Sequence, residues 1–188
     1  MSEPIFFCSE EGQYGFFSNW YPCKFRITYT FTFSLSEEFD GFFCRRADHK
    51  REFSSLEQWM MYCKAAMFPG NEEIVEKIFT VKGSDNHDTQ KQIKELGRQV
   101  KNFDQKVWDN SKEDVVTVGL YFKFSQNEDL LKKLRATKGR PLFEAASYDK
   151  IWGIGLKEEQ ALEYLKDGKP FPGQNLLGKC LERVRNQL

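Results

Sequence analysis

Apolar and polar residues alternate strictly between positions 23 and 33, a pattern that gives a β-strand two distinct faces. Threonine and basic residues fill one face of this segment. The opposite face is apolar and consists of Cys23, Phe25, Ile27, Tyr29, Phe31 and Phe33. The segment therefore predicts one long strand that is buried on a single side.

The residues that follow this strand suggest a hairpin. Residues 34–40 are polar and acidic, which is typical of a turn, and residues 41–44 form a second apolar run. We expect that run to be the partner strand, with residues 47–52 as a charged connector. An extended hairpin is thus predicted near residues 26–52.

Beyond Pro69-Gly70 the apolar spacing changes to that of helices. Asp88 or Thr89 is placed to cap one of them, and Gly168 to close another. Helices are expected at 71–79, 88–100, 111–124, 126–134, 157–165 and 175–187, with a short strand at 141–146. With no linker or repeat along residues 1–188, the prediction is one compact, mostly helical α+β domain with a small antiparallel sheet from the N-terminal third.

Composition narrows the possible partners. The chain is 40% hydrophobic and 15% aromatic, enough for a core and for additional flat rings in a binding site. Lys and Arg number 28, as do Asp and Glu. Because duplex binding depends on neutralising phosphates, this balance argues against an extended duplex-binding surface. Recognition of a single nucleotide remains compatible with it.

The metal-binding and targeting signals of many protein classes are missing. Five scattered cysteines without a C-x-x-C pair and only two histidines suggest neither a disulfide framework nor a metal site. Phosphate-loop, dinucleotide-binding and zinc-protease motifs do not occur. Without a signal peptide or a membrane-spanning apolar run, we expect a protein of the cytosol or nucleus that uses no cofactor and binds no membrane.

An acid and a base lie seven residues apart in the segment 54–64, which is expected to begin a helix. Two helical turns take about seven residues, so Glu57 and Lys64 project from one face, roughly 10 Å apart. Two interpretations are open for each residue. Glu57 closes a capping box with Ser54 or performs acid–base chemistry, and Lys64 is a solvated surface charge or a reactive amine.

Three other segments have both a structural and a ligand-binding interpretation. Gly153 and Gly155 allow a close backbone approach beside Trp152 and Asp149, or simply form a tight loop around a core tryptophan. Residues 16–22 place Ser18 and Asn19 among aromatic rings, or form a turn that Asn19 caps. Residues 175–178 offer helix N-terminal amides to a phosphate, or contain only the N-cap Asn175.

The order of these motifs is specific. Phe-Ser-Asn at 17–19, Glu57 with Lys64, Lys123-Phe-x-Gln126-Asn127, Asp149-x-x-Trp152-Gly-Ile-Gly155 and Asn175-x-Leu-Gly178 succeed one another between about residues 16 and 185. In this order the chain resembles the NADAR, or YbiA-like, family. The Trp-Gly-Ile-Gly element is the clearest mark, and the long charged segment 26–52 is a departure from the family pattern.

The resemblance implies an N-glycosidase. Two substrate groups are implied: ADP-ribose attached to guanine in DNA or RNA, with ADP-ribose as product, and ribosylated pyrimidine intermediates of riboflavin synthesis. A third possibility is a module that only binds ADP-ribose or NAD. The family pattern places chemistry at Glu57, Lys64 and Asp149. It places substrate contacts at Ser18, Asn19, Trp20, Tyr21, Trp152, Gly153, Ile154, Gly155, Asn175, Leu177 and Gly178.

Overall fold

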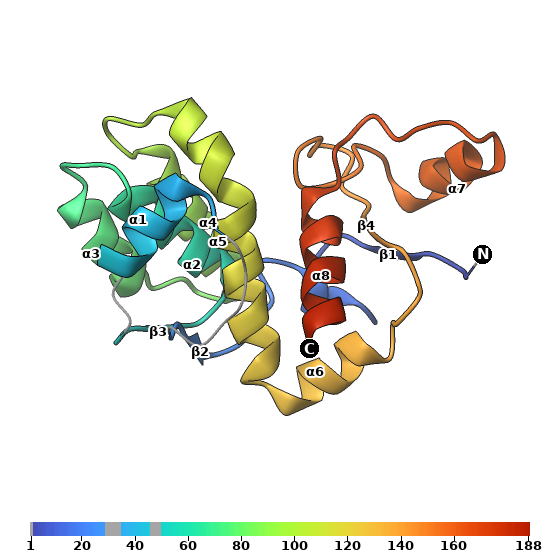
Figure 1. The fold of residues 1–188 in the computed structure, drawn as a ribbon, viewed down its shortest axis with the longest axis horizontal. Coiled ribbons are helices and arrows are strands. Elements are labelled where there is room, and N and C mark those ends of the chain that lie inside the picture. The colour runs from blue at the N-terminus through green and yellow to red at the C-terminus, as the bar shows by residue number, and fades with distance from the viewer. Residues whose placement is uncertain (1, 29–34, 46–49) are drawn as a thin grey trace. The chain divides into compact units, whose positions relative to one another are not determined.

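The computed structural model describes residues 2–28, 35–45 and 50–188. In this part of the chain eight α-helices accompany two small two-stranded sheets (Figure 1). The protein is therefore mostly helical with small sheets, as predicted. Its internal contacts divide it into a first unit, residues 1–21 and 128–188, and a second unit, residues 22–127.

Helix α2 is the centre of the second unit. It spans Leu56–Ala66 and packs against α3 (Glu72–Thr80), α4 (Asn86–Arg98) and α5 (Gln105–Ser125). Gly119 permits the α2–α5 approach, because a Cβ there would lie 2.4 Å from Trp59 Cδ1 and 2.5 Å from Leu56 Cδ1. The buried Trp59 indole donates to Val115 O at 2.8 Å, which satisfies its only polar group. An uninterrupted core thus holds α2 in place.

The predicted hairpin is only partly correct. Strand β2 covers just Phe25–Arg26, although the alternation of exposure extends from Lys24 to Thr28; residues 29–34 lie outside the described part. Its antiparallel partner is β3, Glu52–Phe53, with Phe25 opposite Phe53. The antiparallel pair was predicted, but its second strand was placed too early in the chain.

Residues 37–45 form helix α1 (Glu37–Arg45), not the predicted turn and partner strand. Phe39, Phe42 and Phe43 are all buried, and their i, i+3, i+4 spacing matches one helical face. The helix start is fixed to α5, because Asp114 Oδ2 accepts the Ser36 N–H at 2.7 Å. The strand prediction was wrong because the short apolar run concealed the helical period of these three phenylalanines.

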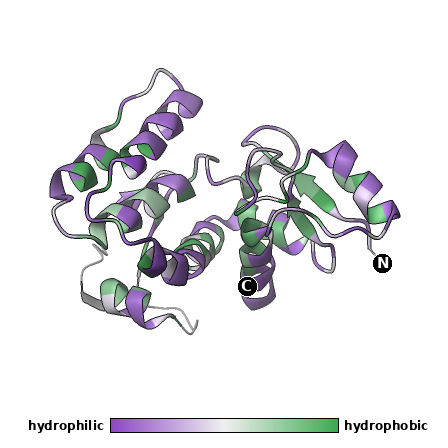
Figure 2. Cartoon of the chain, turned by 90° about the horizontal axis from the view of Figure 1, so that it is seen from above, coloured by the Kyte–Doolittle hydropathy of each residue, from purple (hydrophilic) through white to green (hydrophobic). Residues whose placement is uncertain are grey.

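In the first unit, helix α8 (Leu176–Gln187) lies beside a parallel pair of strands, β1 (Ile5–Phe7) and β4 (Leu142–Glu144) (Figure 1). Strand β1 and the 3-10 helix η1 (Gly15–Phe17) were not predicted. The strands are among the strongly hydrophobic segments in Figure 2. Their buried core includes Ile5, Phe7, Leu142, Leu177, Leu181 and Val184.

The remaining helices of the first unit are α6 (Glu128–Arg135) and α7 (Glu158–Lys166). Both match predicted helices within two residues at each end. The α4 cap differs, since Asp85 is the N-cap and its carboxylate accepts the Asp88 N–H at 2.7 Å. Asp88 and Thr89 are therefore inside the first turn instead of before it.

Candidate active site

The start of α2 is capped without Glu57. Ser55 is the N-cap, and its Oγ accepts the Gln58 N–H at 3.1 Å. Gln58 Oε1 reaches back to the Ser54 N–H at 2.8 Å. The predicted Ser54–Glu57 box is thus wrong by one residue, because the helix begins at Leu56 and places Gln58, not Glu57, at the third position.

Glu57 is nonetheless buried, with 2% of its surface exposed. A carboxylate is rarely buried so completely, because removal from water disfavours its charge. Its place in the first turn partly offsets this cost, since the N-terminal end of a helix favours negative charge. This burial, at a helix position that is neither the N-cap nor the third residue, marks Glu57 as a candidate for chemistry.

Lys64 lies two turns further on and is half-buried, not solvated. Its Nζ lies 4.6 Å from the ring centroid of Phe103 and 6.0 Å from that of Trp108. Burial lowers the pKa of Lys64; the Glu57 charge opposes this shift, and the Arg98 charge adds to it. The amine therefore loses its proton more readily than an ordinary lysine does, as nucleophilic lysines must.

Phe103 and Trp108 belong to this environment but were not predicted as site residues. They lie in the segment around the start of α5, far from α2 in sequence. Aromatic faces attract a lysine cation, and their carbon surface also excludes water from the amine. Only the packing of α2 on this segment shows the association, so no local motif could have found it.

Lys123 is a second unusual amine that was not predicted as a site residue. It is completely buried in α5, and this burial lowers its pKa to about 8, while the Cys23 charge opposes the shift. Lys123 lies one turn after Gly119, the residue that packs on Leu56 of α2. The sequence contains an indication of this burial, because Lys123 is flanked by Phe122 and Phe124 inside an apolar helix.

Gln126 and Asn127, which end the Lys123-Phe-x-Gln126-Asn127 motif, have structural roles. The Gln126 side chain donates to Arg26 O at 2.7 Å and accepts the Arg26 N–H at 2.8 Å. Asn127 Nδ2 donates to Lys24 O at 3.0 Å. Their amides pair with the backbone of β2 as a neighbouring strand would, which holds the end of α5 against that strand.

In the first unit, the loop 149–155 is held to the start of α8. Five consecutive carbonyls, from Lys150 to Ile154, accept backbone N–H groups of residues 173–177 at 2.8–3.1 Å. The donors include Asn175, Leu176 and Leu177, so these amides already have protein acceptors. A phosphate at this helix start would have to use other donors. The Leu177 side chain is also fully buried, so Leu177 has a structural role here.

Asp149 organises this loop. Its Oδ1 accepts the N–H groups of Ile151 and Trp152, each at 2.8 Å. Trp152 and Gly155 are half-buried, whereas Gly153 and Ile154 are buried. The tight-loop interpretation is therefore correct for the backbone, and Trp152 keeps part of its surface accessible.

Asn175 is the N-cap of α8, as predicted, but its side chain bonds to β4 and not to the helix. Nδ2 donates to Leu142 O at 2.9 Å, and Oδ1 accepts the Glu144 N–H at 3.0 Å. Its left-handed backbone, with φ of 54°, makes this reach possible. Gly178 allows the same approach, because a Cβ there would lie 2.1 Å from Leu142 O.

Ser18, Asn19, Trp20 and Tyr21 form one turn in the first unit. Ser18 Oγ accepts the Trp20 N–H at 3.1 Å, and Ser18 O accepts the Tyr21 N–H at 3.3 Å. The turn was predicted, but the capping side chain is Ser18 rather than Asn19. Asn19, Trp20 and Tyr21 are half-buried and keep part of their surface accessible.

The structure therefore groups the predicted residues in three places. Glu57 and Lys64 share α2; residues 149–155 and 175–178 form one bonded cluster; residues 18–21 form one turn. Each unit also has a hollow lined by other residues. One of about 310 Å³ lies beside Ala65 and Ala66, and one of about 840 Å³ lies along β1.

Metal-binding clusters and membrane-spanning helices are both absent from residues 2–28, 35–45 and 50–188. These residues contain no group of three or more His, Cys, Asp or Glu side chains arranged to hold a metal ion. None of their helices combines the length and the apolar character needed to cross a bilayer.

Comparison with known proteins identifies the family. The NADAR domain matches residues 6–188. The chain is a member of the NADAR family. N-glycosidase R617 of Acanthamoeba polyphaga mimivirus is 40% identical over 171 residues, covering 91% of this chain and 86% of that protein.

Two other proteins are similar to this NADAR chain. Protein irg-1 of Caenorhabditis elegans is 33% identical over 174 residues, covering 92% of this chain and 74% of that protein. The NMR structure of the Escherichia coli protein YbiA matches with a TM-score of 0.66 at 24% identity, covering 98% of this chain and 84% of YbiA. At this identity the likeness to YbiA establishes the fold.

Proposed function

We propose that this NADAR protein is an N-glycosidase that removes ADP-ribose from guanine bases in nucleic acid. The observation that carries the proposal is the pair on α2: a buried carboxylate, Glu57, with a half-buried amine, Lys64, whose pKa is lowered by burial. Family membership and the mimivirus relative named as an N-glycosidase support the reaction class. The reaction class is the hydrolysis of an N-glycosidic bond.

The reaction breaks the bond between ribose C1 and a base nitrogen. The bonding electrons leave with the base, which gains a proton, and positive charge develops at C1 and the ring oxygen. A carboxylate stabilises this charge and can activate the water that attacks C1. Glu57 has this role in the proposal.

Lys64 has one of two roles. As a cation it stabilises the departing base or a phosphate. As a neutral amine it attacks the aldehyde of the opened ribose, loses water to form a Schiff base, and is released when water adds back. A lysine held among Phe103 and Trp108 with a lowered pKa suits the second role. Borohydride trapping distinguishes the two.

The residues that the family pattern assigns to substrate binding belong to the first unit. Trp152 and the aromatic side chains Trp20 and Tyr21 are proposed to stack a base, an interaction worth about 1–3 kcal/mol per base. Asp149 retains Oδ2 for a ribose hydroxyl while Oδ1 holds the loop. Ser18 and Asn19 are proposed to contact ribose or phosphate. Asn175 and Gly178 are proposed to act indirectly, because Asn175 bonds to β4 and Gly178 packs against it, which positions the loop that contains Trp152.

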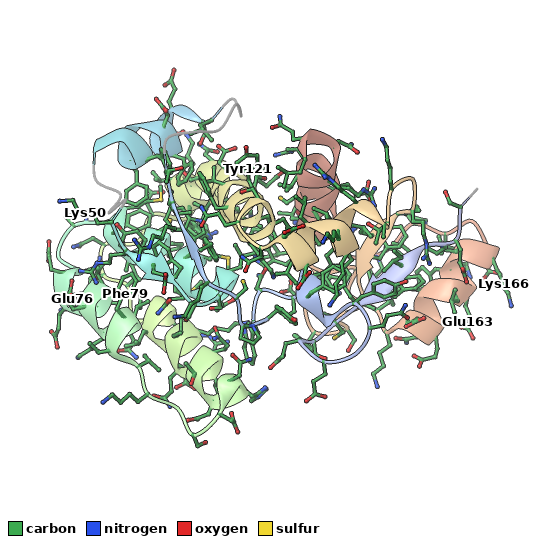
Figure 3. The ribbon with its side chains drawn as sticks, turned by 90° about the horizontal axis from the view of Figure 1, so that it is seen from below. Lys50, Glu76, Phe79, Tyr121, Glu163 and Lys166 are labelled. Atoms are coloured by element: carbon green, nitrogen blue, oxygen red, sulfur yellow. The ribbon has the colours of Figure 1, made fainter. Side chains whose placement is uncertain are left out.

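The direct test is hydrolysis of a single-stranded oligonucleotide that carries one ADP-ribosylated guanine. Wild-type protein should release ADP-ribose, and Glu57→Gln should not. Glu163→Gln is the matched control, because Glu163 is exposed on α7 (Figure 3) and its substitution removes a carboxylate elsewhere. Absence of ADP-ribose release by wild type would refute the proposal.

The same assay separates the alternatives. If a ribosylated pyrimidine intermediate of riboflavin synthesis is cleaved with a higher kcat/KM in direct competition, that compound is the substrate. If ADP-ribose binds saturably while every glycosidic bond stays intact, the protein is a binding module. Activity of Glu57→Gln equal to wild type would refute the role of Glu57.

A further inference from the structure

The loop that precedes α8 presents apolar side chains to water. Tyr148 is 80% exposed and Ile151 45% exposed. Lys150, between them, is also exposed, and Trp152 is half-buried. We define these four side chains as the 148–152 surface. Isolated exposed apolar residues are common, but these cluster within five residues of one loop.

Residues 150–152 of this surface are rigidly supported through their backbone, and Tyr148 is held by a side-chain hydrogen bond with Cys8. The carbonyls of Lys150, Ile151 and Trp152 accept N–H groups from Gln174, Leu176 and Leu177 at 2.8–3.1 Å. The N–H groups of Ile151 and Trp152 donate to Asp149 Oδ1. A loop with its backbone bonded on both sides presents its side chains with little further loss of entropy on binding. Such preorganisation is characteristic of recognition loops.

The chemistry of the surface favours a single nucleic-acid strand. An exposed aromatic ring stacks on any base, and an adjacent lysine neutralises a phosphate. Lys179 adds a second exposed cation in the first turn of α8, to which the loop is bonded. A stable protein interface needs about 800 Å² from each partner, far more than one tyrosine and one isoleucine supply.

We propose that the 148–152 surface binds an unpaired nucleotide next to the modified guanine. Tyr148 stacks on its base and Lys150 contacts its phosphate. The inference rests on the proposed function and deepens it: the preferred substrate is a single strand, not a free modified nucleotide. A footprint of one nucleotide also agrees with the balanced total charge of the chain.

The test compares two substrates, ADP-ribosylated guanosine monophosphate and a single-stranded oligonucleotide with the same modified guanine at its centre. The readout is the ratio of their kcat/KM values. Tyr148→Ala should lower the oligonucleotide preference about five- to hundredfold by removing one stacked base, while Tyr148→Phe retains the ring and most of the preference. Leu162→Ala on α7 is the control, because Leu162 is also apolar and is 45% exposed.

Lys150→Ala provides a separate readout. Removing one phosphate contact should make the slope of log KM against log salt shallower by about 0.7 for the oligonucleotide, and leave it unchanged for the monophosphate. An unchanged substrate ratio in Tyr148→Ala, or equal preference for single-stranded and duplex oligonucleotides in wild type, would overturn the inference.

Failure of the proposed function gives a different result from failure of the 148–152 surface. If wild type hydrolyses neither substrate, fluorescence anisotropy with an unmodified single-stranded oligonucleotide still tests the surface. Tyr148→Ala should then weaken binding about five- to hundredfold. Equal binding by wild type and Tyr148→Ala refutes the surface whatever the enzyme's substrate is.

Discussion

Helix α2 and the loop 149–155 use their polar side chains in opposite ways. On α2 the capping is done by Ser55 and Gln58, so Glu57 is buried without capping the helix. In the loop, Asp149 Oδ1 is bonded to the backbone of its own segment. Helix α2 therefore keeps the Glu57 carboxylate away from water, whereas the loop uses the Asp149 carboxylate to fix the conformation of its backbone.

This difference suggests a division of labour between reaction and recognition. A buried carboxylate and an amine with a lowered pKa are costly for stability, and such costs are typical of catalytic groups. A loop whose backbone groups are hydrogen-bonded and whose rings are exposed destabilises the fold little and is suited to binding. Substitutions in either region should therefore perturb one of these properties without abolishing the other.

The largest effect is expected for Lys64. Lys64→Met should lower kcat about a hundred- to ten-thousandfold, because the amine is either a nucleophile or the charge that stabilises the leaving group. Lys64→Arg keeps the charge but cannot form a Schiff base. Loss of activity in both variants, with borohydride trapping a covalent adduct only on wild type, indicates the Schiff base. An adduct on another lysine would contradict this assignment.

The next effect is on stability in the first unit. Asn175→Ala should lower the free energy of unfolding by about 2–4 kcal/mol, because the buried Leu142 O and Glu144 N–H lose their partners. Urea unfolding provides the measurement. Asn175→Gly loses the same bonds but suits the left-handed backbone, so it should be about 1 kcal/mol more stable than Asn175→Ala. Equal stability of the alanine variant and wild type would show that these bonds are unimportant.

Lys123 gives a prediction about pH. Its pKa is about 8 in the folded protein against 10.5 for an ordinary lysine, so between these values the unfolded chain binds more protons. Stability from this residue therefore rises as pH increases from 8 to 10.5, by up to about 3 kcal/mol at roughly 1.4 kcal/mol per pKa unit.

The measurement is the difference in unfolding free energy between wild type and Lys123→Met across this pH range. Lys123→Met should be the more stable protein at pH 7, and its advantage should shrink above pH 8. The difference cancels the titration of Cys63, whose pKa is raised by burial alone. It retains a contribution from Cys23, because the Lys123 charge opposes the rise that burial causes in the pKa of Cys23. A difference independent of pH would mean that Lys123 keeps an ordinary pKa.

The smallest effect is expected at Asp149. Asp149→Ala should destabilise the loop by about 1–2 kcal/mol through the loss of two backbone hydrogen bonds. Hydrogen exchange should then be faster at the amides of Ile151 and Trp152. Asp149→Asn retains an oxygen acceptor and should protect both amides. If Asp149→Asn nevertheless loses turnover, Asp149 has a chemical role in addition to its role in the loop.

Local sequence patterns predicted most helices, because their apolar residues recur at helical spacing. They failed at α1, where Phe39, Phe42 and Phe43 resemble a strand in a short window but bury one helical face against α5 and α2. Strand β1 was missed because it pairs in parallel with β4 more than a hundred residues away.

For the candidate site, too, local sequence patterns indicated only part of what the structure contains. Glu57 and Lys64 could be chosen as candidates because helical periodicity places them on one face; their roles stay a prediction. Phe103 and Trp108 were not, since they reach Lys64 only through tertiary packing. The motif at Asn175 was found, but its hydrogen bonds to β4 depend on a left-handed backbone that no spacing rule indicates.

Parallel measurement of turnover and stability for Glu57→Gln and Ser55→Ala tests most directly whether the buried carboxylate on α2 serves the reaction and not the helix cap. Glu57→Gln should lose about a hundred- to ten-thousandfold in release of ADP-ribose from ADP-ribosylated guanine and remain at least as stable as wild type, because a neutral amide is easier to bury. Ser55→Ala should lose about 2–3 kcal/mol of stability, because it removes both the cap and the buried hydrogen bond that Ser55 donates to Gln90 Oε1 at 2.7 Å, and it should keep its turnover at temperatures where it is folded. Wild-type turnover in Glu57→Gln would contradict the catalytic role of the buried carboxylate.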